Sequence, residues 1–113
     1  MLTSGVCVHW EELKSNCGED EELMREVVGI FLSESPQMLE DIRQSWREKN
    51  PTALKQTAHR LKGSLMSLAA HAAARSAHAL EQMGYEAKLE GADKMMAELE
   101  SAMSELRTEL LRL

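Results

Sequence analysis

The segment with the clearest chemical potential runs from Thr57 to Ser64, where Lys62 and Gly63 follow His59 by three and four residues. On an α-helix, residues at these spacings lie on the same face in successive turns. A neutral imidazole is a competent nucleophile near neutral pH, because its unperturbed pKa is about 6.5. Lys62 is close enough to offset charge on a phosphoryl group in transit. The segment therefore predicts a histidine that acts as a nucleophile in phosphoryl transfer.

Two residues further along the chain could orient this imidazole. His78 and Glu81 are three residues apart, so they share one face of a helix. One ring nitrogen of a nucleophilic histidine must be held protonated by an acceptor, so that the other nitrogen presents its lone pair. Glu81 could accept the Nδ1–H of His59, and Nε2 would then be the phosphorylated atom.

Gly63 and the surrounding charge indicate that another molecule approaches this segment. A glycine inside a helix costs roughly 1 kcal/mol relative to alanine, and Gly63 lies off the predicted core face. No acidic residue lies between Glu48 and Glu81. The basic residues of this span include Lys55, Arg60, Lys62 and Arg75. We therefore expect the partner to be acidic, or to carry phosphate, at the contact.

The elements that carry these residues are predicted to be helices, because Leu, Ala and Met are abundant and aromatic residues are scarce. After a leader at residues 1–8, a short helix is expected over Trp10 to Ser15, with Gly18 as its breaker. Asp20 is the expected N-cap of the next helix, which either kinks or restarts at Pro36. The apolar stripe of this region is predicted to be Leu23, Val27, Ile30 and Phe31, and then Met38, Leu39, Ile42 and Trp46.

The pair Asn50-Pro51 is the clearest boundary, an N-cap residue followed by proline at the first helical position. The helix after it has a heptad seam that faces a core, formed by Leu54, Ala58, Leu61, Leu65 and Leu68. The chain should turn near residues 69–71. A short helix follows with Gly84 as its C-terminal stop, and its inward residues are Ala73, Ala77 and Leu80. The last seam is Leu89, Ala92, Met96, Leu99, Met103, Leu106, Leu110 and Leu113.

Helices joined by short loops pack as antiparallel neighbours. The sequence therefore predicts an all-α fold, an up-down-up-down four-helix bundle with a short extra N-terminal helix. With 113 residues, the chain has the length of one domain. We expect a flexible leader at residues 1–8 and the bundle at residues 9–113.

Composition excludes several classes of protein. The net charge of −6 argues against a nucleic-acid binder. The sequence has no run of about 18 apolar residues, so it predicts no membrane span. The N-terminus lacks the basic start and apolar stretch of a signal peptide, so we expect a cytoplasmic protein. Cys7 and Cys17 are expected to be ordinary thiols, because no further Cys and no nearby His pair completes a ligand set. We expect no metal, no cofactor and a monomer.

The stretch from Ala58 to Ser64 reads Ala-His-Arg-Leu-Lys-Gly-Ser. It resembles the signature A-H-x-L-K-G-S of the histidine phosphotransfer (HPt) family in every fixed position. The resemblance extends over about residues 8–110. It implies a four-helix bundle with an exposed phosphorylated histidine, here His59, and no independent catalytic activity. It also implies response-regulator receiver domains as phosphoryl donors and acceptors, together with a hybrid sensor histidine kinase.

The resemblance has finer features and departures. The position of Glu81 holds Gln or Glu in many members, and the His78–Glu81 pair resembles the phosphotransfer domain of chemotaxis kinases. Leu65 and Met66 replace the small residues that are common after the serine, and Ala69 stands where many members have glycine. The bulk of Met66 near the docking face affects the expected partner more than the chemistry.

Two other functions compete with a receiver-to-receiver carrier. One is a chemotaxis-type phosphotransfer domain, which an ATP-binding kinase domain elsewhere would phosphorylate. The other is a non-catalytic helical adaptor or a metal-binding bundle built on His78 and Glu81. Di-metal bundles use E-x-x-H motifs, and this spacing does not occur in the sequence.

Overall fold

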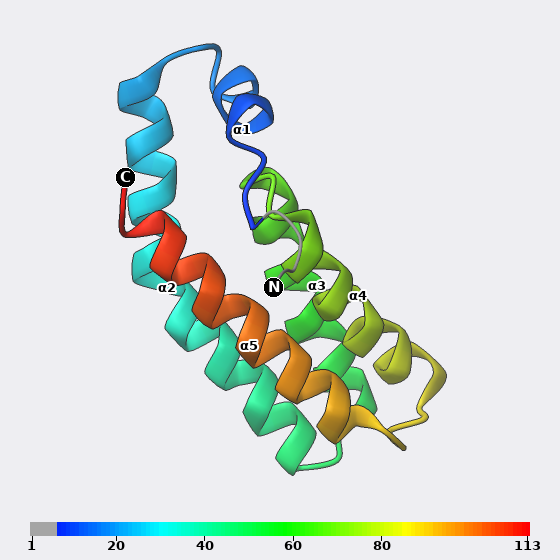
Figure 1. Cartoon of the computed structure of the whole chain (residues 1–113). Coiled ribbons are helices and arrows are strands. Elements are labelled where there is room, and N and C mark those ends of the chain that lie inside the picture. Colours follow the sequence, from blue (N-terminus) through cyan, green and yellow to red (C-terminus); the bar gives the residue numbers. More distant parts are fainter. Residues whose placement is uncertain (1–6) are drawn as a thin grey trace.

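A computed structural model describes residues 7–113, which form five helices and no strand (Figure 1). The helices are α1 (Trp10–Asn16), α2 (Glu21–Arg47), α3 (Pro51–Ser67), α4 (His71–Glu86) and α5 (Ala92–Leu110). Each of the four long helices packs against the next in the chain, and α5 packs back against α2. The short α1 lies at one end of this bundle (Figure 1). The predicted all-α four-helix bundle with an extra N-terminal helix is confirmed.

The helix starts follow from side-chain caps that the sequence predicted. The carboxylate of Asp20 accepts hydrogen bonds from the backbone N–H groups of Glu22 and Leu23 at the start of α2. The side chain of Asn50 accepts from the N–H of Ala53, with Pro51 as the first residue of α3. These caps satisfy N–H groups that have no partner within the helix.

The predicted core face of α3 is confirmed, because every residue of its seam is at most 1% exposed: Leu54, Ala58, Leu61, Leu65 and Leu68. The other confirmed core residues are Ala73, Ala77 and Leu80 in α4, and Ala92, Met96, Leu99, Met103, Leu106 and Leu110 in α5. The two ends of the last predicted seam are wrong, because they lie outside α5: Leu89 is half-buried and Leu113 is 37% exposed. Full burial of a leucine stabilises the fold by about 1.5–3 kcal/mol. The buried face of α3 therefore fixes which of its residues remain on the surface.

The predicted stripe at the start of α2 is wrong by one position at Leu23, Val27 and Ile30, whereas Phe31 is buried as predicted. Leu23 and Ile30 are 42% and 57% exposed, and Val27 is half-buried. The residues that face the core, in regular steps of four and three, are Met24, Val28, Phe31, Ser35, Met38, Ile42 and Ser45. The two serines hide this register in the sequence. Their presence on the seam made the more apolar neighbouring face look like the core.

Pro36 does not divide α2, which is continuous through it. Proline has no N–H, so the carbonyl of Leu32, four residues earlier, lacks its helical partner. The guanidinium of Arg107 in α5 donates to this carbonyl at 3.1 Å. The restart at Pro36 that the sequence allowed is therefore wrong, and a residue from another helix replaces the missing bond.

Gly84 is not the end of α4, as the sequence predicted. The helix continues to Glu86 and ends at Ala87, whose φ of 56° is left-handed. Gly84 is buried where α4 crosses the start of α3. A Cβ at this position would lie 2.6 Å from the backbone N of Lys55 and 2.7 Å from the carbonyl O of Pro51. The glycine thus allows the two helix backbones to approach closely.

The N-terminal segment joins the bundle earlier than expected. Residues 1–6 of the predicted leader lie outside the described part of the chain. Val8, which the prediction also placed in the leader, is 1% exposed, and the next residue, His9, donates its N–H to the carbonyl of Ala69. Among residues 7–113, no helix has the length and apolarity needed to cross a membrane.

Candidate functional site

His59 lies on the surface of α3, one residue after the buried Ala58. Its side chain is 66% exposed, whereas Ala58 and Leu61 are fully buried. The heptad seam holds the helix in this register, because turning His59 inward would expose the leucines. The core of the bundle therefore leaves the imidazole exposed to solvent.

Glu81 of α4 connects the other polar residues of the site. Its Oε2 lies 2.6 Å from Nδ1 of His59. Its Oε1, which is shielded from solvent, forms an ion pair with Nζ of Lys62 at 2.7 Å and lies 3.4 Å from Nδ1 of His78. The structure therefore brings together His59, Lys62, Glu81 and His78, four of the residues that the sequence singled out.

The protonation of Glu81 decides which nitrogen of His59 is free. Partial burial raises the pKa of Glu81, but the Lys62 ammonium and the His59 N–H outweigh it and lower that pKa below its ordinary value. Glu81 is therefore ionised at neutral pH, and a carboxylate can only accept a hydrogen bond. Nδ1 of His59 must then carry the proton, and the lone pair is on Nε2.

Gly63 has no packing function within the bundle. It is exposed one turn after His59, and a Cβ built on it would meet no atom within 4 Å. This differs from Gly84, where backbone atoms leave no room. The open space above Gly63 is available to another molecule.

Two further histidines meet at the end of the bundle. Nε2 of His71 lies 3.0 Å from both carboxylate oxygens of Glu12, and the rings of His9 and His71 are 5.0 Å apart. These contacts join the segment around α1 to the start of α4. Among residues 7–113, no group of three or more His, Cys, Asp or Glu side chains could hold a metal ion. Cys7 and Cys17 are unpaired.

The sequence matches the family model of the Hpt domain over residues 26–109. The chain belongs to the Hpt family. This Hpt domain therefore has a histidine phosphotransfer role in two-component phosphorelays, whose members act with receiver domains and kinases. Hpt proteins carry phosphoryl groups rather than act as catalysts.

Solved structures support the fold of this Hpt domain. It is similar to the crystal structure of histidine-containing phosphotransfer protein B (HptB) from Pseudomonas aeruginosa PAO1, with a TM-score of 0.88 at 20% sequence identity. The similarity covers 96% of this chain and 95% of that chain. No curated protein sequence matches this one.

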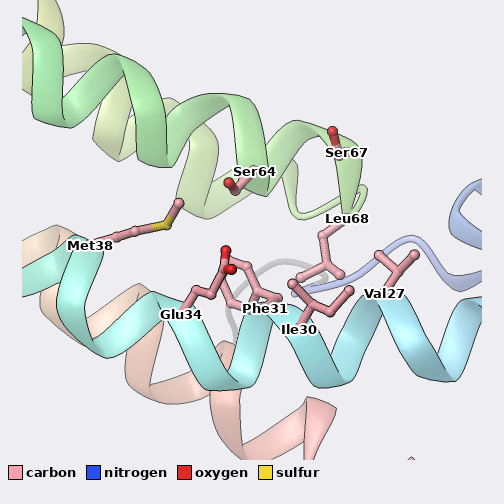
Figure 2. Close-up of a pocket in the computed structure, with 8 residues that line it drawn as sticks. All are labelled: Val27, Ile30, Phe31, Glu34, Met38, Ser64, Ser67 and Leu68. Atoms are coloured by element: carbon pink, nitrogen blue, oxygen red, sulfur yellow. The ribbon is translucent and has the colours of Figure 1, made fainter.

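Sequence reasoning missed one part of the surface of α3 in this Hpt domain. A groove between α2 and α3 is lined by Val27, Ile30, Phe31, Glu34, Met38, Ser64, Ser67 and Leu68 (Figure 2). We call it the α2–α3 groove. Its rim residues Val27 and Ile30 were assigned to the core. Extending the spacing of Met38 and Ile42 backwards in steps of four and three reaches Phe31 instead, and this would have left Ile30 on the surface.

Proposed function

We propose that Nε2 of His59 accepts the phosphoryl group from a receiver-domain aspartate and passes it to the aspartate of another receiver. The observation that carries this proposal is the 2.6 Å contact between Nδ1 of His59 and the Glu81 carboxylate. It fixes the ring tautomer on a side chain that is 66% exposed. The domain is a carrier in this scheme, and the receivers supply the rest of the catalytic machinery.

The transfer step follows from this tautomer. The lone pair of Nε2 attacks the phosphorus of the aspartyl phosphate, the bond from phosphorus to the carboxyl oxygen breaks, and the aspartate leaves as a carboxylate. Because Nδ1 keeps its proton, the phosphorylated ring is cationic. The Glu81 carboxylate lies against that charge and offsets it. The reverse attack by another receiver's aspartate restores the neutral imidazole.

Lys62 has two possible partners in this scheme. In the unphosphorylated domain its ammonium pairs with Glu81 at 2.7 Å and so holds the carboxylate that orients His59. It is one turn from His59 on the same helix, within reach of a phosphoryl group on Nε2. We propose that it positions Glu81 before transfer and stabilises the phosphoryl charge during transfer.

The receiver is proposed to dock over Gly63 and the α2–α3 groove. Gly63 leaves the backbone uncovered, and the exposed Ile30 gives an apolar rim to the groove between the helices (Figure 2). An apolar groove that opens to solvent between polar rim residues is typical of an interaction site. This face therefore supports an approach of the receiver aspartate to Nε2.

Substitution of His59 tests the assignment. His59→Gln is expected to abolish labelling from phosphorylated receivers, while the melting temperature stays close to that of the wild type, because the side chain is off the core. His78→Gln is the matched control. It keeps His59, so we expect phosphorylated receivers still to label it. An acid-labile, alkali-stable label that persists in His59→Gln would show that another histidine is the acceptor.

A kinase-fed, chemotaxis-type domain is the alternative, and the position of His78 beside Glu81 favours it. The two functions differ in the phosphoryl donor. The protein is incubated either with a panel of phosphorylated receivers or with sensor and chemotaxis kinase domains and ATP. Labelling by receivers supports the relay, and labelling by a kinase domain alone supports the alternative.

A further inference from the structure

A second groove lies beside His59, between α3 and α4, and the function described above does not use it. We call it the α3–α4 groove, and it is lined by Lys62, Met66, His71, Ala74, Arg75 and His78. Its volume of about 510 Å³ is within the range of clefts that take up a ligand or a side chain, about 300–1,000 Å³. Lys62 and His78 also belong to the phosphotransfer site, so the groove is continuous with it.

The floor and wall of the α3–α4 groove are apolar. Ala74 is 6% exposed and forms part of the floor, whereas Met66 is 52% exposed on the same face of α3 as Lys62 and His59. Methionine is flexible and polarisable, and it is often used where a surface must adapt to a partner. Exposed apolar surface rimmed by polar residues marks an interaction site. The groove is therefore built to accept an apolar group.

The rim of this groove carries one uncompensated positive charge. Lys62 is neutralised by Glu81, and His71 is paired with Glu12. Arg75 is exposed, and it makes no ion pair with a carboxylate of residues 7–113 within 4.0 Å. Among the described residues that line the groove, Arg75 of α4 is thus the only cationic side chain without a carboxylate partner.

The other side of His59 has the opposite charge. Glu34 lines the α2–α3 groove (Figure 2). Glu34 forms no ion pair with a cationic side chain of residues 7–113, whereas Asp41, two helical turns further along α2, is paired with Arg60 of α3 at 3.9 Å. The uncompensated charges on the two sides of the phosphotransfer site are therefore Glu34 on α2 and Arg75 on α4.

We infer that the α3–α4 groove is a specificity site, which takes up an apolar side chain flanked by carboxylates from the receiver docked over His59. This inference rests on the proposed function. Arg75 pairs with the receiver's acidic group, and Met66 packs against its apolar side chain. The charge difference between the two flanks fixes the orientation of the receiver, because the opposite orientation would place its carboxylates against Glu34. Complementary charge at an interface rim acts mainly on association rate and partner choice.

Charge reversal at Arg75 tests the inference. Transfer to the intact protein from a phosphorylated receiver that labels the wild type is measured as kcat/KM for Arg75→Glu, Arg75→Gln and the control Arg112→Glu. Arg112 is exposed just after α5, which lies diagonally across the bundle from α3, and its reversal gives the same net charge. We expect kcat/KM to fall about tenfold for Arg75→Glu at low ionic strength, within the range seen for association rates of interface variants. The kcat/KM of Arg75→Gln should lie between those of Arg75→Glu and the wild type, and that of Arg112→Glu should stay within about twofold of the wild type.

Two further measurements separate docking from chemistry. In about 0.5 M salt the deficit of Arg75→Glu should shrink to less than about twofold, because screening shortens electrostatic reach to a few ångströms. Labelling by acetyl phosphate, which needs no protein docking surface, should be unchanged in both Arg75 variants. Met66→Gln keeps the side-chain length but removes its apolar character, and it should raise KM for the receiver severalfold at every salt concentration.

The outcomes distinguish this inference from the proposed function. If receivers label the wild type but Arg75→Glu and Arg112→Glu behave alike, the groove is not a specificity site and the relay function stands. If Arg75→Glu also loses acetyl phosphate labelling, Arg75 acts on the chemistry, and the docking role is refuted. If no receiver labels the wild type, the proposed function and this inference both fail.

Discussion

Two glycines in neighbouring helices should respond in opposite directions to the same substitution. Gly84 of α4 is buried against the backbone of α3, whereas Gly63 of α3 faces open space. Replacing either with alanine gains the same helix propensity, about 1 kcal/mol. The difference between the two variants therefore measures what the added methyl group meets.

The magnitude follows from the distances at Gly84. A Cβ would be 2.6 Å from the backbone N of Lys55 and 2.7 Å from the carbonyl O of Pro51. Backbone atoms inside a helix cannot rotate away, so α3 and α4 must separate locally. Overpacking of this kind costs about 1–3 kcal/mol, and more when backbone must move. We expect Gly84→Ala to lower the free energy of unfolding by about 1–2 kcal/mol, and Gly63→Ala to raise it by up to about 1 kcal/mol.

The same displacement should affect phosphoryl transfer. Glu81 lies one turn before Gly84 on α4, so a shift of this helix away from α3 lengthens the contact between Glu81 and His59. Gly84→Ala should therefore slow labelling by receivers and by acetyl phosphate. Gly63→Gln places bulk on the docking face instead. It should slow labelling by receivers, because small misplacements of the reacting groups cost about a hundredfold per ångström, and leave acetyl phosphate labelling nearly unchanged.

The assay combines urea unfolding with thermal melting and both labelling rates for the wild type and the three variants. A change of 1 kcal/mol corresponds to a shift of about 4–8 °C for a domain near this size. Gly84→Ala should melt below the wild type and Gly63→Ala above it. If Gly84→Ala is as stable as Gly63→Ala, the close approach of α3 and α4 does not explain the glycine. If Gly63→Gln melts lower and transfers normally, Gly63 serves packing and the docking argument is refuted.

Three more predictions follow from the same structure. Because the pKa of Glu81 is lowered on folding, its stabilisation is present above its ordinary pKa and is lost as the pH falls below about 4.3. Glu81→Gln should thus show a weaker loss of unfolding free energy than the wild type between about pH 5 and pH 3; equal losses would contradict this. Leu61→Ala should cost about 2–5 kcal/mol, while Lys62→Ala, which removes the ion pair with Glu81, costs about 1 kcal/mol yet slows transfer; equal costs in urea unfolding would mean that α3 is rotated. Ala87→Gly should stabilise by about 0.5–1 kcal/mol, because its φ of 56° suits glycine, whereas Ala97→Gly in α5 should destabilise by about 1 kcal/mol; the same sign for both would refute the left-handed cap.

Local signals were sufficient for much of the fold. The cap at Asn50 and the seam of α3 could be read from the sequence, because both depend on residues within a few positions of one another. The seam also placed His59 on the surface. A leucine heptad leaves only one face for the core, so the remaining positions of the helix are exposed. That His59 and Lys62 share a helix face, and that His78 and Glu81 do, could be predicted for the same reason.

Tertiary structure decided the features that depend on residues far apart in the chain. Pro36 lies in a continuous helix, and Arg107, 71 positions later, donates to the carbonyl that the proline leaves free. Gly84 continues its helix because α3 crosses it there. The two serines on the seam of α2 show the same limit, because their burial depends on the helices that cover them.

In the phosphotransfer site, too, some features follow from the sequence and others only from helix packing. The sequence determined that His59 is exposed on a helix and that Glu81 carries an acceptor. Only the packing of α3 against α4 placed Oε2 of Glu81 at 2.6 Å from Nδ1 of His59 and Oε1 against Lys62. Helical periodicity specifies the face on which a residue lies, but the distance between side chains on two helices depends on how closely their backbones pack. In this protein α3 and α4 can pack this closely partly because Gly84 has no side chain.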